Sequence, residues 1–370
     1  MNKRTAGVGG GILLIILAVF SVIFGQDLVG QYSDVVENGG NGSTSGDVPS
    51  SDWYEIYFTN PTCPPEDQRT GGLDETIAAD ISQAQLQVDV AAYDLDAEPI
   101  VNALIDLEAR GVTVRVVTDE DNADLSSIRR LRRGGISVVE DKRTALMHDK
   151  FIVVDGRYVW MGSLNYTSNG VYCNNNNLVR FDSSRLAANY TAEMNEMYDD
   201  KSFGPDSPDA TPKEQQTING IQLENYFGPE KEISPIIARA VTSAQEEILF
   251  LAFSFTDEQI GEAMLGRADA GVTLRGVFET VGSDTGSSYF PDMAQDEMTM
   301  PNIAVRTDGN PHVMHHKVII IDRETVIFGS FNFSDSANRR NDENIIIVHD
   351  PTFAGYFVEE FNAVWDEAQQ

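Results

Sequence analysis

The pattern of apolar and polar positions in the body of the chain predicts alternating strands and helices. Residues 88–93, VDVAAY, form a β-rich run, and the next segment places apolar residues at helical spacing up to Gly111, which suits a helix C-cap. A second extended run, VTVRVVTD, follows, then a helical stretch and the short strands ISVVED and FIVVD. This alternation predicts an α/β fold in which helices cover the faces of a sheet.

The same pattern is written twice. The segment from Gln83 aligns without a gap with the segment from Ser243, so that Tyr93 matches Phe253 and Gly111 matches Gly271. Further on, ISVVED matches IAVRTD once a seven-residue insertion is allowed in the Gly- and Ser-rich loop at 282–289. A duplication of this kind predicts two repeated α/β domains, related by a pseudo-twofold axis, with a cleft between them.

The domain boundaries follow from composition. We expect the first repeated domain at residues 53–200 and the second at 218–370. The Pro-, Asp- and Ser-rich stretch at 201–217 is expected to link them, and the Gly-, Ser- and Asn-rich stretch at 31–52 is expected to be a flexible tether.

Residues 1–30 have the features of a targeting segment. An uncharged run, 7–25, follows Lys3 and Arg4 and is just long enough to cross a bilayer. We favour a membrane anchor over a cleaved signal peptide, because no small-x-small cleavage site precedes Gln26. Either reading places the body outside the cytoplasm.

Composition excludes several classes of protein. Hydrophobic residues make up 41% of the 370 residues, which excludes global disorder, and two cysteines exclude both a disulfide framework and a zinc site of four thiolates. The 26 basic and 58 acidic residues give a formal charge of −32, which argues against a surface that is basic overall and binds DNA or anionic lipid.

Histidine and lysine recur at equivalent places in both repeats. His148, Lys150 and Asp155 precede Ser163 and Asn165 in the first repeat, while His315, Lys317 and Asp322 precede Ser330 and Asn332 in the second. Each His-x-Lys pair lies on a predicted strand, so the two side chains share a face.

Such a constellation suits a phosphodiester. Two lysines can stabilise the phosphate charge, one histidine can attack phosphorus, and the other can protonate the leaving oxygen. Ser163, Asn165, Ser330 and Asn332 could bind the phosphate oxygens, whereas Asp155 and Asp322 are expected to be structural.

His-x-Lys, four residues, Asp and then Gly-Ser-x-Asn resembles the signature of the phospholipase D superfamily. The resemblance covers the body from about Tyr54 onward, and it is nearest to the branch of the small bacterial endonuclease and mitochondrial cardiolipin hydrolase. It implies the phospholipase D fold, with an active site between two mixed sheets flanked by helices. It also implies a phosphodiesterase that needs no metal or other cofactor and forms a covalent phosphohistidine.

The family usually adds a downstream acidic residue that supports the histidine. Glu343 lies at a suitable distance after His315 in the chain, but the same spacing counted from His148 leads to Asn176. A carboxylate raises the pKa of an imidazolium, whereas an amide only orients the ring. We therefore expect Glu343 to support His315 as the general acid and Asn176 to support His148 as the nucleophile.

The substrate stays open between two classes. The anchor and the acidic exterior favour a phospholipid, cut to phosphatidate and a free headgroup by a monomeric enzyme. The resemblance to the endonuclease branch, together with an arginine cluster (Arg129, Arg130, Arg132 and Arg133), makes an extracytoplasmic nuclease the alternative. A phosphatidyltransferase and a non-catalytic binding module rank lower.

Two further features have two readings each. The arginine cluster is more typical of a solvated helix face than of a nucleic-acid patch. Cys63 and Cys173 flank loops of the first repeat and could pair in an oxidising compartment, or could stay free.

Overall fold

The computed structural model describes residues 50–368. The predicted anchor and nearly all of the predicted tether lie outside these residues. Within them, no helix combines the length and apolar character needed to cross a bilayer.

The first repeat forms one eight-stranded mixed sheet of order β1-β2-β9-β7-β6-β3-β4-β5. The strands β3, β4 and β5 pair in parallel, and the others pair antiparallel. The strands are β1 (Ser50–Ser51), β2 (Tyr54–Phe58), β3 (Gln87–Ala92), β4 (Thr113–Asp119), β5 (Ser137–Asp141), β6 (Lys150–Val154), β7 (Tyr158–Gly162) and β9 (Asn177–Asp182). The helices of this half are α2 (Leu73–Ile81), α3 (Glu98–Ala109), α4 (Ser126–Arg133), α5 (Ser168–Tyr172) and α6 (Ser184–Asn195).

The second repeat copies this sheet, in the order β10-β11-β18-β17-β16-β12-β13-β14. Its strands are β10 (Gln215–Ile218), β11 (Ile221–Gly228), β12 (Glu247–Ala252), β13 (Thr273–Phe278), β14 (Ile303–Thr307), β16 (Lys317–Ile321), β17 (Thr325–Gly329) and β18 (Glu343–His349). Its helices are α7 (Ser234–Thr242), α8 (Glu258–Asp269), α9 (Phe290–Glu297), α10 (Asp335–Arg339) and α11 (Pro351–Glu367). The two repeated α/β domains expected from the sequence are therefore present.

The predicted helix end at Gly111 is also found. Gly111 and its counterpart Gly271 follow α3 and α8 with positive φ angles of 86° and 95°, which a residue without Cβ adopts readily. The segment expected to link the halves is less uniform, since β10 begins at Gln215, inside the range 201–217.

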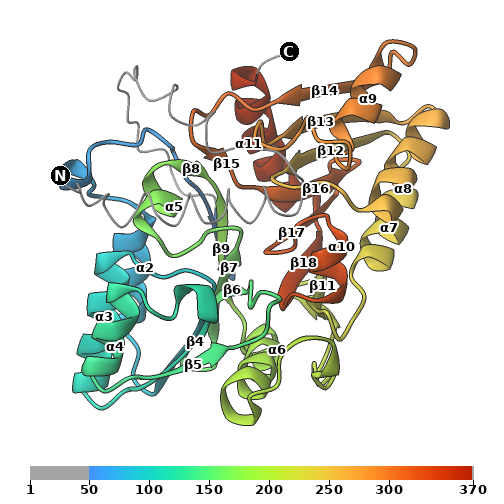
Figure 1. Ribbon diagram of the computed structural model, residues 1–370. Coiled ribbons are helices and arrows are strands. Elements are labelled where there is room, and N and C mark those ends of the chain that lie inside the picture. The colour runs from blue at the N-terminus through green and yellow to red at the C-terminus, as the bar shows by residue number, and fades with distance from the viewer. Residues whose placement is uncertain (1–49, 369–370) are drawn as a thin grey trace.

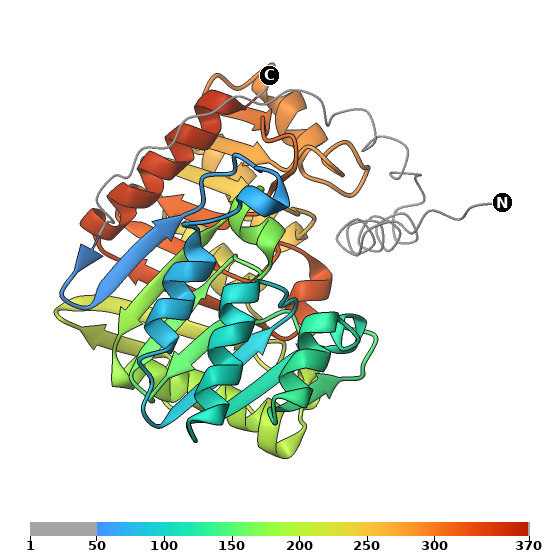
Figure 2. The ribbon, with the colours of Figure 1, turned by 90° about the vertical axis from the view of Figure 1, so that its left-hand side faces the viewer.

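The two sheets face each other across a shared apolar core. Helices α2, α3 and α4 cover the outer face of the first sheet, while α7 and α8 cover the outer face of the second (Figure 1). Figure 2 shows α2, α3 and α4 side by side in front of the first sheet. One continuous core between the sheets includes Tyr190 of α6 and Phe353 and Phe357 of α11, so each half contributes one helix to the joint.

Candidate active site

In the first half, the strand β6 carries the basic pair. Lys150 is the first residue of β6, and His148 precedes it by two positions. The Lys150 ammonium donates a hydrogen bond of 2.7 Å to the backbone carbonyl of His148, and both side chains are buried. The lysine is thereby fixed beside its own histidine, on the same face, as the strand alternation predicted.

The second half repeats this geometry. Lys317 begins β16, and its ammonium donates to the carbonyl of His315 at 2.9 Å. An aromatic ring lies edge-on against each imidazole: Tyr93 with a centroid distance of 5.2 Å to His148, and Phe253 with 4.8 Å to His315. Tyr93 and Phe253 match in the repeat, although no motif in the sequence predicts their contact with the imidazoles.

The support residues are exchanged between the halves. Glu343 lies with both carboxylate oxygens 2.9 Å from Nδ1 of His148, and Asn176 lies with Oδ1 2.9 Å from Nδ1 of His315. The predicted pairs, Glu343 with His315 and Asn176 with His148, are therefore wrong. Each half supplies the partner for the histidine of the other half.

The exchange has a cause in the backbone. The segment before His148 runs alongside the segment before Glu343: the His148 amide donates to the Asp342 carbonyl, and the Asp342 amide donates to the Leu146 carbonyl, both at 2.9 Å. The segments before Asn176 and His315 are also paired, as a two-stranded parallel sheet of β8 (Asn174–Asn175) with β15 (Val313–Met314). There the His315 amide donates to the Asn175 carbonyl at 2.9 Å. A spacing counted along one half of the chain cannot reveal this cross-pairing.

The serines of the Gly-Ser-x-Asn turns hold the support residues. Ser163 donates to Asn176 Oδ1 at 2.9 Å, and Ser330 donates to Glu343 Oε2 at 2.6 Å. Each serine also accepts from the backbone amide of the residue after its support residue, Asn177 or Asn344. The serines thus orient Asn176 and Glu343, and their hydroxyl protons are used in these bonds. The predicted role of Ser163 and Ser330 as donors to the phosphate oxygens is therefore corrected to support of these two residues.

The turn asparagines have unused hydrogen-bonding capacity. Among the described residues, Oδ1 of Asn165 and Oδ1 of Asn332 are buried and have no partner. A buried amide oxygen without a partner is costly unless a ligand or water satisfies it. An amide oxygen accepts hydrogen bonds, so these two atoms suit a ligand or water that donates one. The predicted binding of phosphate oxygens would instead use the Nδ2 groups, and it stays a prediction.

The motif aspartates lie away from the imidazoles and hold turns. Asp155 accepts from the backbone amides of residues 85, 86 and 87 at 2.8–3.0 Å. Asp322 accepts in the same way from residues 245, 246 and 247 at 2.8–2.9 Å. Both therefore anchor the start of a neighbouring strand, β3 or β12, as the structural reading expected.

A further pair of acids, which the sequence reasoning missed, holds the backbone before each histidine. Asp119 accepts from the Met147 amide at 2.8 Å, and Glu279 accepts from the Met314 amide at 2.7 Å. The two acids occupy equivalent positions of the repeat, each next to the end of a strand. The recurrence of an acid at this position in both repeats is the sequence feature that could have predicted their role.

Electrostatics link the two halves into one site. Burial lowers the pKa of both His148 and His315 well below the usual value, and the charges of Lys150 and Lys317 lower each of them further. Burial also lowers the pKa of Lys150 to about 8 and raises that of Glu343 to about 8. The charges of both ammonium groups act on each imidazole. The duplicated motifs therefore form a single buried centre.

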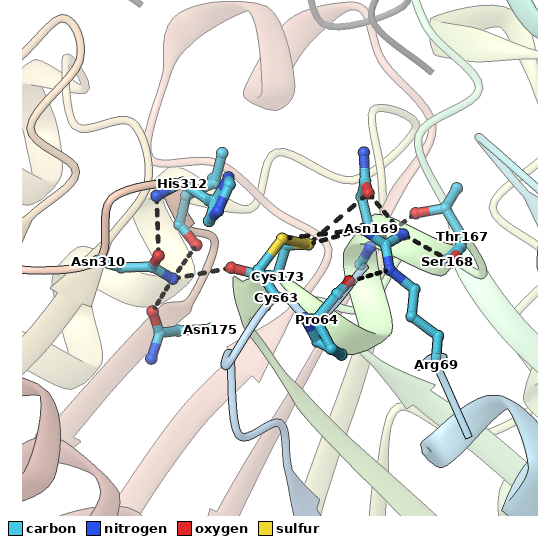
Figure 3. The surroundings of a disulfide bond; sticks show 12 residues. Cys63, Pro64, Arg69, Thr167, Ser168, Asn169, Cys173, Asn175, Asn310 and His312 are labelled. Atoms are coloured by element: carbon cyan, nitrogen blue, oxygen red, sulfur yellow. Dashed lines mark hydrogen bonds between the residues drawn. A yellow bond between two sulfur atoms is a disulfide. The ribbon is translucent and has the colours of Figure 1, made fainter. Parts of the chain in front are cut away.

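The other candidate features resolve differently. Cys63 and Cys173 form a disulfide with an S–S distance of 2.05 Å (Figure 3). In the arginine cluster on α4, Arg130 pairs with Glu98 and Arg132 pairs with Glu140, and Arg129 bonds a backbone carbonyl. Two of its four charges are therefore paired with acids of the first half, which favours a solvated helix face over a nucleic-acid patch.

Comparison with known proteins gives a consistent family. The model of the PLD-like domain of cardiolipin synthase matches the chain twice, over residues 77–198 and 237–365. A phospholipase D of Rickettsia conorii is 32% identical over 144 residues, covering 39% of this chain and 70% of that protein. The mitochondrial cardiolipin hydrolase of Chlamydomonas reinhardtii is 31% identical over 121 residues, which are 32% of this chain and 54% of that relative, about half its length.

A solved structure extends the likeness to both halves. The phosphatidylserine synthase of Haemophilus influenzae superposes with a TM-score of 0.67 over 85% of this chain and 86% of that chain, at 13% identity, which shows a shared fold. With two matches to the family model and a duplicated His-x-Lys site at the joint of two matching sheets, the chain belongs to the phospholipase D family.

Proposed function

We propose that this protein is a phosphodiesterase of the phospholipase D type, which hydrolyses a phospholipid to phosphatidate and a free headgroup through a phosphohistidine. One observation carries the proposal: His148 and His315 each have Nδ1 held by an acceptor from the opposite half, beside two buried lysines. With Nδ1 held, Nε2 is the nitrogen that can react with substrate.

In the first step, Nε2 of His148 attacks phosphorus and forms the N–P bond. The bond from phosphorus to the headgroup oxygen breaks, and this oxygen receives a proton from Nε2 of His315. Lys150 and Lys317 balance the charge of the phosphoryl oxygens, and the Nδ2 groups of Asn165 and Asn332 donate hydrogen bonds to them.

In the second step, water attacks the phosphoryl group on His148. Nε2 of His315 accepts the water proton, the N–P bond breaks, and phosphatidate leaves. Atoms and protons balance over the cycle, because His315 regains the proton that it gave to the headgroup.

The exchanged support residues keep His148 as the nucleophile but for a new reason. Attack converts a neutral imidazole into a buried phosphoimidazolium cation, which a carboxylate 2.9 Å from Nδ1 stabilises better than an amide does. Burial raises the pKa of Glu343 in the site without substrate. Once the phosphoimidazolium forms, its positive charge favours the ionised carboxylate. Asn176 gives His315 an amide oxygen instead of a charge, and burial together with the ammonium groups of Lys317 and Lys150 lowers the pKa of His315. Its protonated ring is therefore a strong acid toward the leaving oxygen.

Four observations favour a phospholipid over nucleic acid. The formal charge of −32 opposes long polyanions, and two of the four arginines of α4 are paired with acids. Relatives above 30% identity are named phospholipase D and cardiolipin hydrolase. The uncharged N-terminal run, if it anchors the chain, would also keep the site beside a membrane.

The test offers the purified full chain three substrates in EDTA: phosphatidylcholine vesicles, cardiolipin vesicles and single-stranded DNA. We expect headgroup release from at least one lipid, unaffected by EDTA, since the lysines supply the positive charge. Quenched reactions should carry the phosphoryl group on His148, mapped by mass spectrometry, and His148→Asn should abolish the adduct. Cleavage of DNA with untouched lipid would reject the proposal, and an adduct on His315 would reverse the two roles.

A further inference from the structure

Two side chains outside the family motif bridge the halves at equivalent places. Arg143 follows β5 in the first half and Asn310 follows β14 in the second, and the two positions match when the repeats are aligned in this part of the chain. The repeat therefore keeps a hydrogen-bond donor at this position but changes its chemistry from a guanidinium to an amide.

Arg143 reaches into the second half. Its Nη1 donates to the Arg340 carbonyl at 3.0 Å, and its Nη2 pairs with the Asp342 carboxylate. The same guanidinium pairs at 2.8 Å with Asp141 of its own half. Asp141 and Asp342 are both buried, so the arginine holds two buried carboxylates together across the joint.

Asn310 makes the mirror-image contacts in the first half. Its Nδ2 donates to the Cys173 carbonyl at 3.1 Å and to Asn175 Oδ1 at 2.6 Å (Figure 3). Its Oδ1 accepts from the His312 amide at 2.8 Å, and its own amide donates to Asp308 at 2.9 Å. Cys173 and Asn175 are the repeat counterparts of Arg340 and Asp342, in the same alignment that pairs Arg143 with Asn310.

Each bridge ends next to a support residue. Asp342 directly precedes Glu343, and Asn175 directly precedes Asn176. The same two residues, Asp342 and Asn175, also offer the carbonyls that accept the amides of His148 and His315. A shift of either bridged segment would therefore move a histidine and its Nδ1 partner together.

We propose that Arg143 and Asn310 are positioning residues, one for each histidine: Arg143 sets the His148–Glu343 pair, and Asn310 sets the His315–Asn176 pair. The assignment of each to a chemical step rests on the proposed function. Arg143 then serves attack on phosphorus, and Asn310 serves protonation of the leaving oxygen.

The segments that Asn310 and Arg143 contact differ in their other attachments to the protein. The disulfide attaches Cys173 to Cys63, whereas its counterpart Arg340 is exposed and its guanidinium bonds only Ser336 among the contacts described. Removing Arg143 would also leave Asp141 and Asp342 buried without their cation. Arg143→Lys, which keeps the charge but loses the fork, is therefore the variant to use, with Asn310→Ala for the other bridge.

Histidine NMR on the full chain tests the pairing without any need for activity. The chain has only five histidines, so ring-¹⁵N labelling gives a spectrum that can be assigned by substitution. We expect Asn310→Ala to shift the ring signals of His315, and of nearby His312, while those of His148 stay in place. Arg143→Lys should do the reverse. Two control variants should shift none of these signals: Lys142→Ala, at the exposed residue next to Arg143, and Asn362→Ala, at an exposed position of α11.

Leaving-group dependence tests the assignment to steps. On an alkyl phosphodiester we expect each variant to lose about 10- to 100-fold in kcat/KM, the range expected when reacting groups are misplaced by up to about 1 Å. On a 4-nitrophenyl diester, whose leaving group needs no proton, Asn310→Ala should recover most of its loss and Arg143→Lys should not.

The outcomes separate this inference from the proposed function. Equal shifts of both histidines in each variant, or no shift at the paired histidine, would overturn the positioning roles. If the NMR pattern holds but neither diester is cleaved by the unmodified chain, the positioning stands and the proposed function fails. Equal losses of Asn310→Ala on both diesters would overturn its assignment to protonation.

Discussion

The two imidazoles of the site differ chiefly in the atom that faces Nδ1. His148 meets a carboxylate and His315 meets an amide oxygen, both at 2.9 Å. A carboxylate can neutralise a full positive charge on the ring, whereas an amide can only fix its orientation and tautomer. This difference breaks the symmetry of an otherwise duplicated centre and supports distinct roles for the histidines.

Glu343→Gln tests that difference at a single atom. The amide can still bond Nδ1 and Ser330, but it cannot compensate the phosphoimidazolium. We expect the rate of adduct formation, measured by rapid quench, to fall about 100-fold, a loss similar to that of one electrostatic stabiliser in other enzymes. Glu359→Gln, on an exposed face of α11, is the control. An unchanged burst rate would show that the charge of Glu343 has no part in the step.

The buried lysines and histidines of the site predict that anion binding depends on pH. Burial lowers the pKa of Lys150 to about 8, and it lowers those of His148, His315 and Lys317 as well. A bound tungstate raises these pKa values, so binding takes up protons and the affinity falls as pH rises. Between pH 7 and 9 we expect about a tenfold loss per pH unit for each proton taken up. Calorimetry in buffers of different ionisation enthalpy measures the uptake, and an affinity independent of pH would contradict it.

At the scale of elements, the short pairing of β8 with β15 is decisive. These strands contain two residues each, yet they carry the backbone of one half to the histidine of the other. Further contacts hold β8 in place: Thr59 donates to the Asn174 carbonyl at 2.6 Å, and the disulfide attaches Cys173, which directly precedes β8, to Cys63. A strand this short depends on such neighbours for its stability.

The disulfide should therefore matter for stability. It joins residues 110 positions apart, and a cross-link of that span is worth about 2–5 kcal/mol through the entropy of the unfolded chain. We expect the Cys63→Ser/Cys173→Ser double variant to lose a free energy of unfolding in this range in urea titrations. Dithiothreitol should destabilise the unmodified chain and leave the double variant unchanged. Equal stability of the two proteins would contradict the prediction.

At the scale of the whole molecule, the candidate active site exists only because two complete sheets meet. One shared core joins them through α6 and α11, and each half supplies a histidine, a lysine and the support residue for the other half. Neither half alone contains both a histidine and the residue that holds its Nδ1. The joint thus holds both the main core and the proposed catalytic centre.

Double-mutant cycles on tungstate affinity test this exchange. His148→Ala with Glu343→Ala, and His315→Ala with Asn176→Ala, should show coupling energies of about 1 kcal/mol or more, because each pair shares a hydrogen bond. The within-half combinations, His148 with Asn176 and His315 with Glu343, should couple less. Stronger coupling within the halves would contradict the structure.

The sequence alone determined much of this protein. The apolar periodicities and the internal repeat predicted two α/β domains, and the paired motifs predicted which imidazoles and ammonium groups would converge, because local pattern decides strands, helices and strand faces. Tertiary structure decided what faces what across the joint: Glu343 against His148, Asn176 against His315, and Arg143 and Asn310 as bridges. These contacts join residues far apart in the chain, and they follow from backbone pairing between the halves, which leaves no periodic trace in either half.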